Sequence, residues 1–173
     1  MSRAPFQVLV LPYRRIAVGL QVAALHRTDH DLWQFVSGGG EAGETVERAA
    51  RREAREEAGI PEDATFLSLD AKAMLPACWF AAWPAWPDDL LLVPEHAFAV
   101  EVGARALELS GEHDELRWVH YDEAIARLRF DSNRIALWEL HERLYPAVRC
   151  KRPAFDTQHA GRCACSPPAN ETC

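Results

Sequence analysis

Three glutamates, Glu53, Glu56 and Glu57, are spaced so that a helix would bring their carboxylates onto one face. At about 100° per residue, the i, i+3, i+4 spacing gathers them within roughly 100° around the helix axis. Like charges this close repel one another and destabilise the helix unless a positive charge lies among them. Hard divalent cations prefer oxygen ligands, so the pattern predicts a site for Mg²⁺, with Mn²⁺ as the alternative ion.

The residues around these glutamates predict where the helix begins and ends. Thr45 can cap its N-terminus through the hydroxyl group, and Gly59 lies where a helix needs a left-handed residue to stop. A glycine-rich turn, Gly38–Gly40, precedes the helix and lets the backbone approach a metal or a phosphate closely. We therefore assign Gly38 to the metal site and Ser37, directly before it, to substrate binding.

The glycines, the glutamates and one arginine follow a fixed pattern over 23 residues, G-x5-E-x7-R-E-U-x-E-E-x-G-U, in which U is a small or aliphatic residue. The specified positions are all filled, by Gly38, Glu44, Arg52, Glu53, Ala54, Glu56, Glu57, Gly59 and Ile60. A pattern this long seldom arises by chance. It is the Nudix box, and the chain resembles the Nudix hydrolases, which cleave nucleoside diphosphates linked to another moiety. The alternative, a solvated and charge-rich helix, explains neither the glycines nor the spacing.

Arg52 has two candidate partners. It lies four residues before Glu56, a spacing at which side chains meet on a helix. In Nudix hydrolases the matching arginine instead braces the glycine-rich loop through the glutamate that corresponds to Glu44. Both arrangements stay open here. The resemblance implies that Arg52, Glu53 and Glu56 are catalytic residues, and it leaves open which glutamate is the general base.

A further metal ligand is implied from outside the box. In the bacterial pyrophosphohydrolases of the family, a glutamate at the position of Glu112 binds metal from a loop opposite the box; ordinary acidic loop composition is the alternative. The implied ligands are Glu53, Glu56, Glu57, Glu112 and Gly38. Two or more Mg²⁺ held by them would neutralise the charge of a diphosphate bridge and lower the pKa of a bound water.

Segments outside the box narrow the resemblance. The segments 33–39, 111–113 and 131–134 resemble those of bacterial dihydroneopterin triphosphate and dATP pyrophosphohydrolases. This implies hydrolysis of a (deoxy)nucleoside triphosphate or dihydroneopterin triphosphate to the monophosphate and pyrophosphate. The alternatives are an ADP-ribose hydrolase, because Pro76 lies near a marker proline of that subfamily, a dinucleoside polyphosphate hydrolase, and a non-catalytic nucleotide-binding module on the same fold.

Residues expected to contact the substrate lie on both sides of the box. Arg27 can hold a phosphate oxygen, and His26 precedes it where the relatives carry a basic pair. Trp79 can stack on a base or a pterin. It belongs to a stretch rich in Trp and Pro, 76–95, that matches the relatives poorly. We expect this stretch to form one wall of a pocket for the ring of a small nucleotide or pterin triphosphate.

Apolar runs predict the elements that position these residues. Strands are expected over 6–11, 21–25, 32–37, 66–69, 96–102 and 116–119, with another near 78–80. Asp122 is expected to cap a helix through Leu128, and the pair Asp131-Ser132 a last helix. Strands mixed with helices in this way predict an α/β fold, and the resemblance implies a Nudix α/β/α sandwich with a mixed sheet.

Length and composition predict one compact domain. The chain has 173 residues, of which 49% are hydrophobic. We expect a Nudix hydrolase domain over 1–150 and an extension over 151–173 that has no packed core of its own. The unusual spacing of Cys163 and Cys165 in the extension argues against a zinc site.

The charge and the hydropathy of the chain limit which partners and which compartment we expect. A net charge of −7 argues against a nucleic-acid polymer as a partner. No apolar run approaches the ~20 residues of a membrane span, and no signal peptide precedes the first strand. We therefore expect no membrane partner and a cytoplasmic location.

Overall fold

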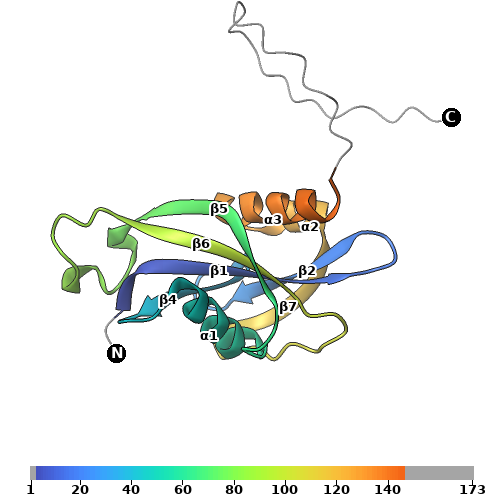
Figure 1. The fold of residues 1–173 in the computed structure, drawn as a ribbon, viewed down its shortest axis with the longest axis horizontal. Helices are drawn as coiled ribbons and strands as arrows, with labels where there is room; N and C mark the ends of the chain where they lie inside the picture. Colours follow the sequence, from blue (N-terminus) through green and yellow to red (C-terminus); the bar gives the residue numbers. More distant parts are fainter. Residues whose placement is uncertain (1–2, 147–173) are drawn as a thin grey trace, which may run out of the picture.

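Residues 3–146, which the computed structural model describes, form a seven-stranded mixed sheet with helices on both faces (Figure 1). The strand order is β3-β2-β1-β6-β5, with β4 also pairing to β1 and β7 to β2. The strands are β1 (Arg3–Arg15), β2 (Leu20–Arg27), β3 (Leu32–Gln34), β4 (Val36–Glu41), β5 (Phe66–Pro76), β6 (Leu92–Glu101) and β7 (His113–His120). The helices are α1 (Val46–Ala58), α2 (Tyr121–Arg127) and α3 (Asp131–Leu144), with short 3-10 helices η1 (Ala77–Trp79) and η2 (Trp83–Ala85) between β5 and β6.

Strand β1 is buried on both faces of the sheet. It pairs in parallel with β6 and antiparallel with β4 and β2. Val8 and Val10 pack with the alanines of α1, whereas Leu9 and Leu11 pack with α3 on the other face. A strand covered on both faces has a continuous apolar run instead of an alternating one. The expected α/β/α sandwich with a mixed sheet is confirmed.

Helix α1 begins and ends where its capping residues predict. The hydroxyl of Thr45 accepts the backbone N–H of Arg48 at 3.3 Å. Gly59 has a φ of 64°, in the left-handed region, and its N–H donates to the carbonyls of Ala54 and Arg55. These local bonds fix which residues of the helix face the sheet.

Two other expectations about local structure are wrong. The segment 78–80 is not a strand, because β5 ends at Pro76 and the 3-10 helices follow. Proline cannot donate to a strand ladder, and Pro84 lies in the first turn of η2 instead. Asp122 and Asp131 are not capping residues. Each lies inside the first turn of its helix, where a negative charge favours the helix dipole, and the residue before each helix makes no side-chain cap.

The connection between β5 and β6, residues 77–91, has its own small apolar cluster. Ala77, Trp86 and Val93 are buried together, apart from the two clusters on the faces of the sheet. The indole Nε1 of Trp86 donates to the carbonyl of Arg3 at 2.9 Å. This bond ties the connection to the beginning of β1.

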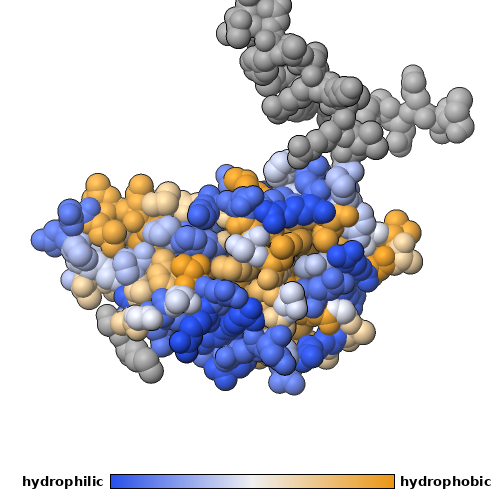
Figure 2. Space-filling model, in the orientation of Figure 1, coloured by the Kyte–Doolittle hydropathy of each residue, from blue (hydrophilic) through white to orange (hydrophobic). Residues whose placement is uncertain are grey.

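Apolar side chains are exposed at the same end of the sheet. Trp79, Trp83 and Leu91 are exposed there. Figure 2 shows hydrophobic residues beside hydrophilic ones at this end, while hydrophilic residues gather over α1. Within the described part of the chain, none of the helices combines the length and the apolar character that crossing a membrane requires. The predicted extension over 151–173, with Cys163 and Cys165, lies outside the described residues.

Candidate active site

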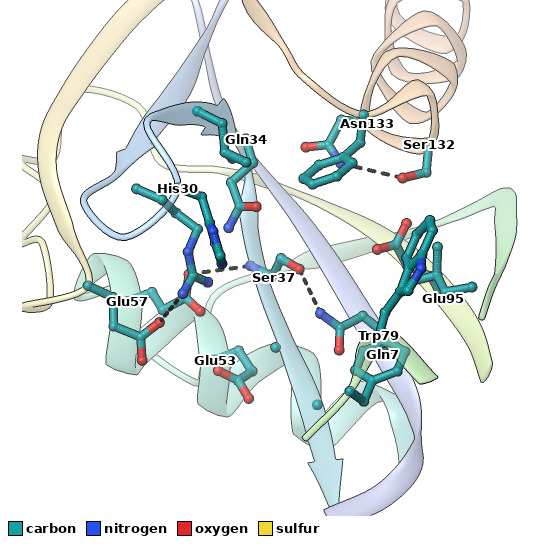
Figure 3. Close-up of a pocket in the computed structure, with 18 of the residues that line it drawn as sticks. Gln7, His30, Gln34, Ser37, Glu53, Glu57, Trp79, Glu95, Ser132 and Asn133 are labelled. Carbon is teal, nitrogen blue, oxygen red and sulfur yellow. Dashed lines mark hydrogen bonds and ion pairs between the residues drawn. The ribbon is translucent and has the colours of Figure 1, made fainter. Parts of the chain in front are cut away.

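A cavity of about 450 Å³ gathers side chains from α1, the strands and the beginning of α3. Its lining includes seven of the residues predicted from the sequence, namely Arg27, Ser37, Gly38, Glu53, Glu57, Trp79 and Glu112. Figure 3 shows Glu53 and Glu57 on one side and Glu95 and Trp79 on the other, with Ser37 between them. The cavity therefore has an acidic end on α1 and a second end formed by other elements.

Arg52 makes both of the interactions left open by the sequence. Its guanidinium donates to both carboxylate oxygens of Glu44, at 3.1 and 3.0 Å, and to Glu56 at 3.1 Å. It also donates to Glu53 at 2.9 Å and to the carbonyl of Gly39 at 2.8 Å. The hydrogen bonds to Glu44, followed by those to Glu53, raise the pKa of Arg52. One cation thus links the helix to the glycine-rich strand β4.

Gly38 and Glu53 are in close contact. A Cβ atom at Gly38 would overlap the carboxyl group of Glu53, so only glycine leaves room for that side chain. Burial raises the pKa of Glu53, although the hydrogen bond and charge of Arg52 oppose this. The glycine therefore places a carboxylate directly over the strand at the cavity wall.

Glu57 is buried, with 6% of its surface exposed. One of its oxygens accepts the backbone N–H of Ser37 at 3.3 Å, and His113 Nε2 lies 3.9 Å from the same oxygen. Burial, and next the charge of Glu53, raise the pKa of Glu57 to about 8. The positive charge of Arg27 opposes this rise without overcoming it, and a bound cation would lower the pKa further.

Arg27 and Glu112 also line the cavity. Arg27 donates to both carboxylate oxygens of Asp29, at 2.8 and 2.7 Å, and its Nη2 lies 3.5 Å from Glu112. The hydrogen bond to Asp29 is the main cause that raises the pKa of Arg27. A phosphate group would compete with Asp29 for this guanidinium.

Three predicted residues do not line the cavity. Arg52 lies behind Glu53, and Glu56 points outward with 48% of its side chain exposed. The imidazole of His26 lies 2.7 Å from Asp114 and 3.0 Å from Asp31, and it packs against Trp33. Its contacts hold β2 to the segments around it, and its role in substrate binding stays a prediction.

The geometry of the acidic helix agrees with the comparison to protein families. The NUDIX domain pattern matches residues 7–140, which include the whole sheet apart from the first residues of β1. The chain belongs to the Nudix family. Two glutamates of its box, Glu53 and Glu57, lie on α1 and line the cavity.

Solved Nudix structures share both the fold and much of the length. A Listeria monocytogenes protein described as a NUDIX hydrolase is 43% identical, with a TM-score of 0.74, and the match covers 82% of this chain and 94% of that one. The Escherichia coli dihydroneopterin triphosphate pyrophosphohydrolase is 26% identical, with a TM-score of 0.67 and coverage of 83% and 99%. The chain is a Nudix hydrolase.

One curated relative has a name from outside the Nudix family. The octanoyltransferase of Myxococcus xanthus is 38% identical over 104 residues, which are 60% of this chain. The match spans 27% of that protein's length. The name therefore describes a protein of which this Nudix chain resembles only a part.

Nudix hydrolases generally use divalent cations, and the donor atoms here suit one. Glu53, Glu57 and Glu112 supply carboxylate oxygens at the cavity, which hard cations prefer. Burial of the Glu57 carboxyl group, together with the charges of Glu53 and Glu112, raises its pKa, and a bound cation would offset both effects. Within residues 3–146 no three acidic, histidine or cysteine side chains already converge as a closed ligand set. The assignment of individual ligands stays a prediction.

The other end of the Nudix cavity was not predicted from the sequence. Gln7, Gln34, Glu95 and Asn133 line it, and all four are buried. Gln7 and Glu95 are neighbours on β1 and β6, and Gln7 donates to the hydroxyl of Ser37 at 2.8 Å. A polar residue within an apolar strand was the available signal, since buried polar groups require partners.

The pKa of Glu57 predicts how stability of this Nudix domain changes with pH. Because the folded chain holds this proton more tightly than the unfolded chain, the resulting stability is complete below about pH 4.5 and is lost as pH rises to about 8. Without divalent cations, the free energy of unfolding should fall by at most about 1.4 kcal/mol per pH unit in this window.

Urea unfolding of the metal-free protein at several pH values measures this. The Glu57→Gln variant, which cannot titrate there, should lack this part of the decrease, and Mg²⁺ should reduce it in the wild type. Parallel pH profiles of the two proteins would contradict the assignment.

Proposed function

We propose that the chain is a pyrophosphohydrolase that converts a purine (deoxy)nucleoside triphosphate or dihydroneopterin triphosphate to the monophosphate and pyrophosphate. The observation that carries the proposal is the two-ended cavity, with Glu53 and Glu57 at one end and Trp79 at the other. The acidic end suits a polyphosphate with its cations, and the aromatic end suits a flat ring. The similarity to the E. coli dihydroneopterin triphosphate pyrophosphohydrolase supports the same choice.

Glu53, Glu56, Glu57 and Glu112 would hold the divalent cations, Mg²⁺ or Mn²⁺, with the backbone at Gly38 close by. When bound, the cations neutralise the diphosphate bridge and lower the pKa of the attacking water. Glu56 is exposed, and its bond to Arg52 would have to yield for it to serve as a ligand.

Residues of the chain itself bind the substrate, position Glu53 and accept the proton. Arg27 binds a phosphate oxygen, and Ser37 contacts the substrate between the two ends of the cavity. Arg52 holds Glu53 in position through its hydrogen bond at 2.9 Å. Whichever carboxylate, of Glu53 or of Glu56, is not bound to a cation takes a proton from the attacking water, while the oxygen of that water forms a bond to phosphorus. The phosphoanhydride bond breaks, and pyrophosphate leaves.

A substrate panel tests this proposal. In the presence of Mg²⁺, dihydroneopterin triphosphate and purine dNTPs should be hydrolysed with release of pyrophosphate and not of single phosphates. ADP-ribose and dinucleoside polyphosphates should be cleaved at least about tenfold less efficiently, because neither offers a compact ring with a terminal triphosphate. Chromatographic separation of monophosphate, pyrophosphate and phosphate measures the products.

A higher kcat/KM for ADP-ribose or a dinucleoside polyphosphate would overturn the substrate proposal. The Nudix chemistry would remain. The absence of hydrolysis across the panel, with binding retained, would instead support a nucleotide-binding module.

A further inference from the structure

The end of the cavity away from α1 contains a carboxyl group that the proposed hydrolysis does not use. Glu95 lies on β6, is 6% exposed and lines the cavity. Ser132, at the beginning of α3, hydrogen-bonds to it, and burial raises its pKa. A buried carboxyl group is costly unless its oxygens find donors. The cavity is the side from which further donors can come.

Two amide groups at the same end have unused N–H donors. Gln34 is 5% exposed, and its Nε2 has no hydrogen-bond partner. The Oδ1 of Asn133 accepts the backbone N–H of Phe35 at 2.9 Å, which fixes the amide and leaves its Nδ2 only a 3.5 Å contact to Ser132. Figure 3 shows Gln34, Asn133 and Glu95 around one space. A ligand there would meet an acceptor and two donors.

Aromatic side chains line the space as well. Trp79 and Phe130 are 68% and 40% exposed, and both line this cavity and the hollow next to it. Exposed aromatic rings can stack on the face of a flat heterocycle, while the buried polar groups beside them hydrogen-bond to its edge.

We infer that Glu95, Gln34, Asn133, Trp79 and Phe130 form a ring site that selects a guanine or pterin ring over adenine. Guanine and pterin carry a ring N–H and an amino group side by side, which suit the two oxygens of Glu95. The carbonyl oxygen next to them suits the amide donors of Gln34 and Asn133. This inference rests on the proposed function, since the ring enters attached to the phosphates.

Adenine presents the opposite pattern. It has a ring nitrogen lone pair where guanine has N–H, and an amino group where guanine has a carbonyl. In the ring site the lone pair would face the oxygens of Glu95, and the amino group would face the N–H donors of Gln34 and Asn133. Each mismatch leaves a buried polar group unpaired.

Binding of GMP and AMP by isothermal titration calorimetry tests the ring site without requiring hydrolysis. The wild type should bind GMP more tightly than AMP. Glu95→Gln should weaken GMP binding about 10- to 100-fold, because one bidentate contact is lost, and should not weaken AMP binding, because adenine makes no matched contact with Glu95. Glu101→Gln is the matched control, since Glu101 lies on the same strand outside the cavity and should leave both affinities unchanged.

Gln34→Met provides a second variant that does not alter the buried carboxyl group. It should weaken GMP binding about tenfold and should not weaken AMP binding. Tighter binding of AMP than GMP by the wild type, or an equal loss for both ligands in Glu95→Gln, would overturn the ring site.

Hydrolysis assays separate this inference from the proposed function. Release of pyrophosphate from dGTP and dATP at equal kcat/KM would refute the ring site and leave the proposed function intact. A higher kcat/KM for a guanine nucleotide other than a triphosphate than for dGTP, with GMP selectivity that depends on Glu95, would refute the proposed function and support the ring site.

Discussion

Glu57→Gln is expected to lower kcat for Mg²⁺-dependent hydrolysis by more than about 100-fold. Changes to residues that only support metal ligands already cost about 10- to 100-fold, and Glu57 is proposed as a direct ligand. The side chain is buried at the acidic end of the cavity, so no neighbouring water can take its place at low cost. Steady-state kinetics over a range of Mg²⁺ concentrations measure both the loss and any shift in Mg²⁺ dependence.

The fold should survive this substitution. Glutamine keeps the size of the side chain and removes a buried charge, so the melting temperature of Glu57→Gln should not fall below that of the metal-free wild type at pH 8. Glu47→Gln is the matched control on the same helix, because Glu47 is exposed and pairs with Arg51 away from the cavity. Near-normal hydrolysis by Glu57→Gln would refute the metal assignment.

Arg52→Ala is expected to lower the free energy of unfolding by about 3–5 kcal/mol, as happens when one partner of a buried ion pair is removed. The carboxylates of Glu44 and Glu53, whose side chains are 13% and 12% exposed, would lose their shared cation. Arg52→Lys should restore only part of the stability, because an ammonium group cannot reach all the acceptors that the planar guanidinium reaches.

Urea unfolding at neutral pH measures the effect. Arg55→Ala is the control, since Arg55 lies on the same helix and pairs only with exposed glutamates, so its removal should change stability by less than about 0.5 kcal/mol. At about pH 4 the loss in Arg52→Ala should shrink, because protonation removes the unpaired charges. Equal stability of the Arg52 and Arg55 variants would refute the bracing role.

The sequence predicted the acidic half of the site because its determinants are local. The spacing within one helix, the cap at Thr45 and the stop at Gly59 place the glutamates without reference to distant residues. Arg52 shows the limit of this reasoning. Helical spacing offered Glu56 as its partner and the resemblance to Nudix hydrolases offered Glu44, whereas a guanidinium with five N–H groups binds both at once.

The ring site could not be predicted in the same way. Its polar residues come from β3, β6 and α3, and only the pairing of strands far apart in the sequence brings them to one cavity. The stretch 76–95 was expected to form one wall of the pocket, and its residue Trp79 does line the cavity. The strand expected near 78–80 was wrong, because a short apolar run is consistent with either a strand or a tight helical turn.

The small cluster under residues 77–91 has a consequence for protein engineering. This connection contributes Trp79 to the cavity, and its buried residues Ala77 and Trp86 pack with Val93 of β6, whereas α1 packs on a separate cluster. A graft that exchanges the connection would have to keep two anchors in the rest of the domain, namely Val93 on β6 and the carbonyl of Arg3 that accepts the indole N–H of Trp86. The cavity wall that carries Trp79 can therefore be exchanged between these two anchors, while helix α1, which bears the proposed metal ligands, keeps its own packing.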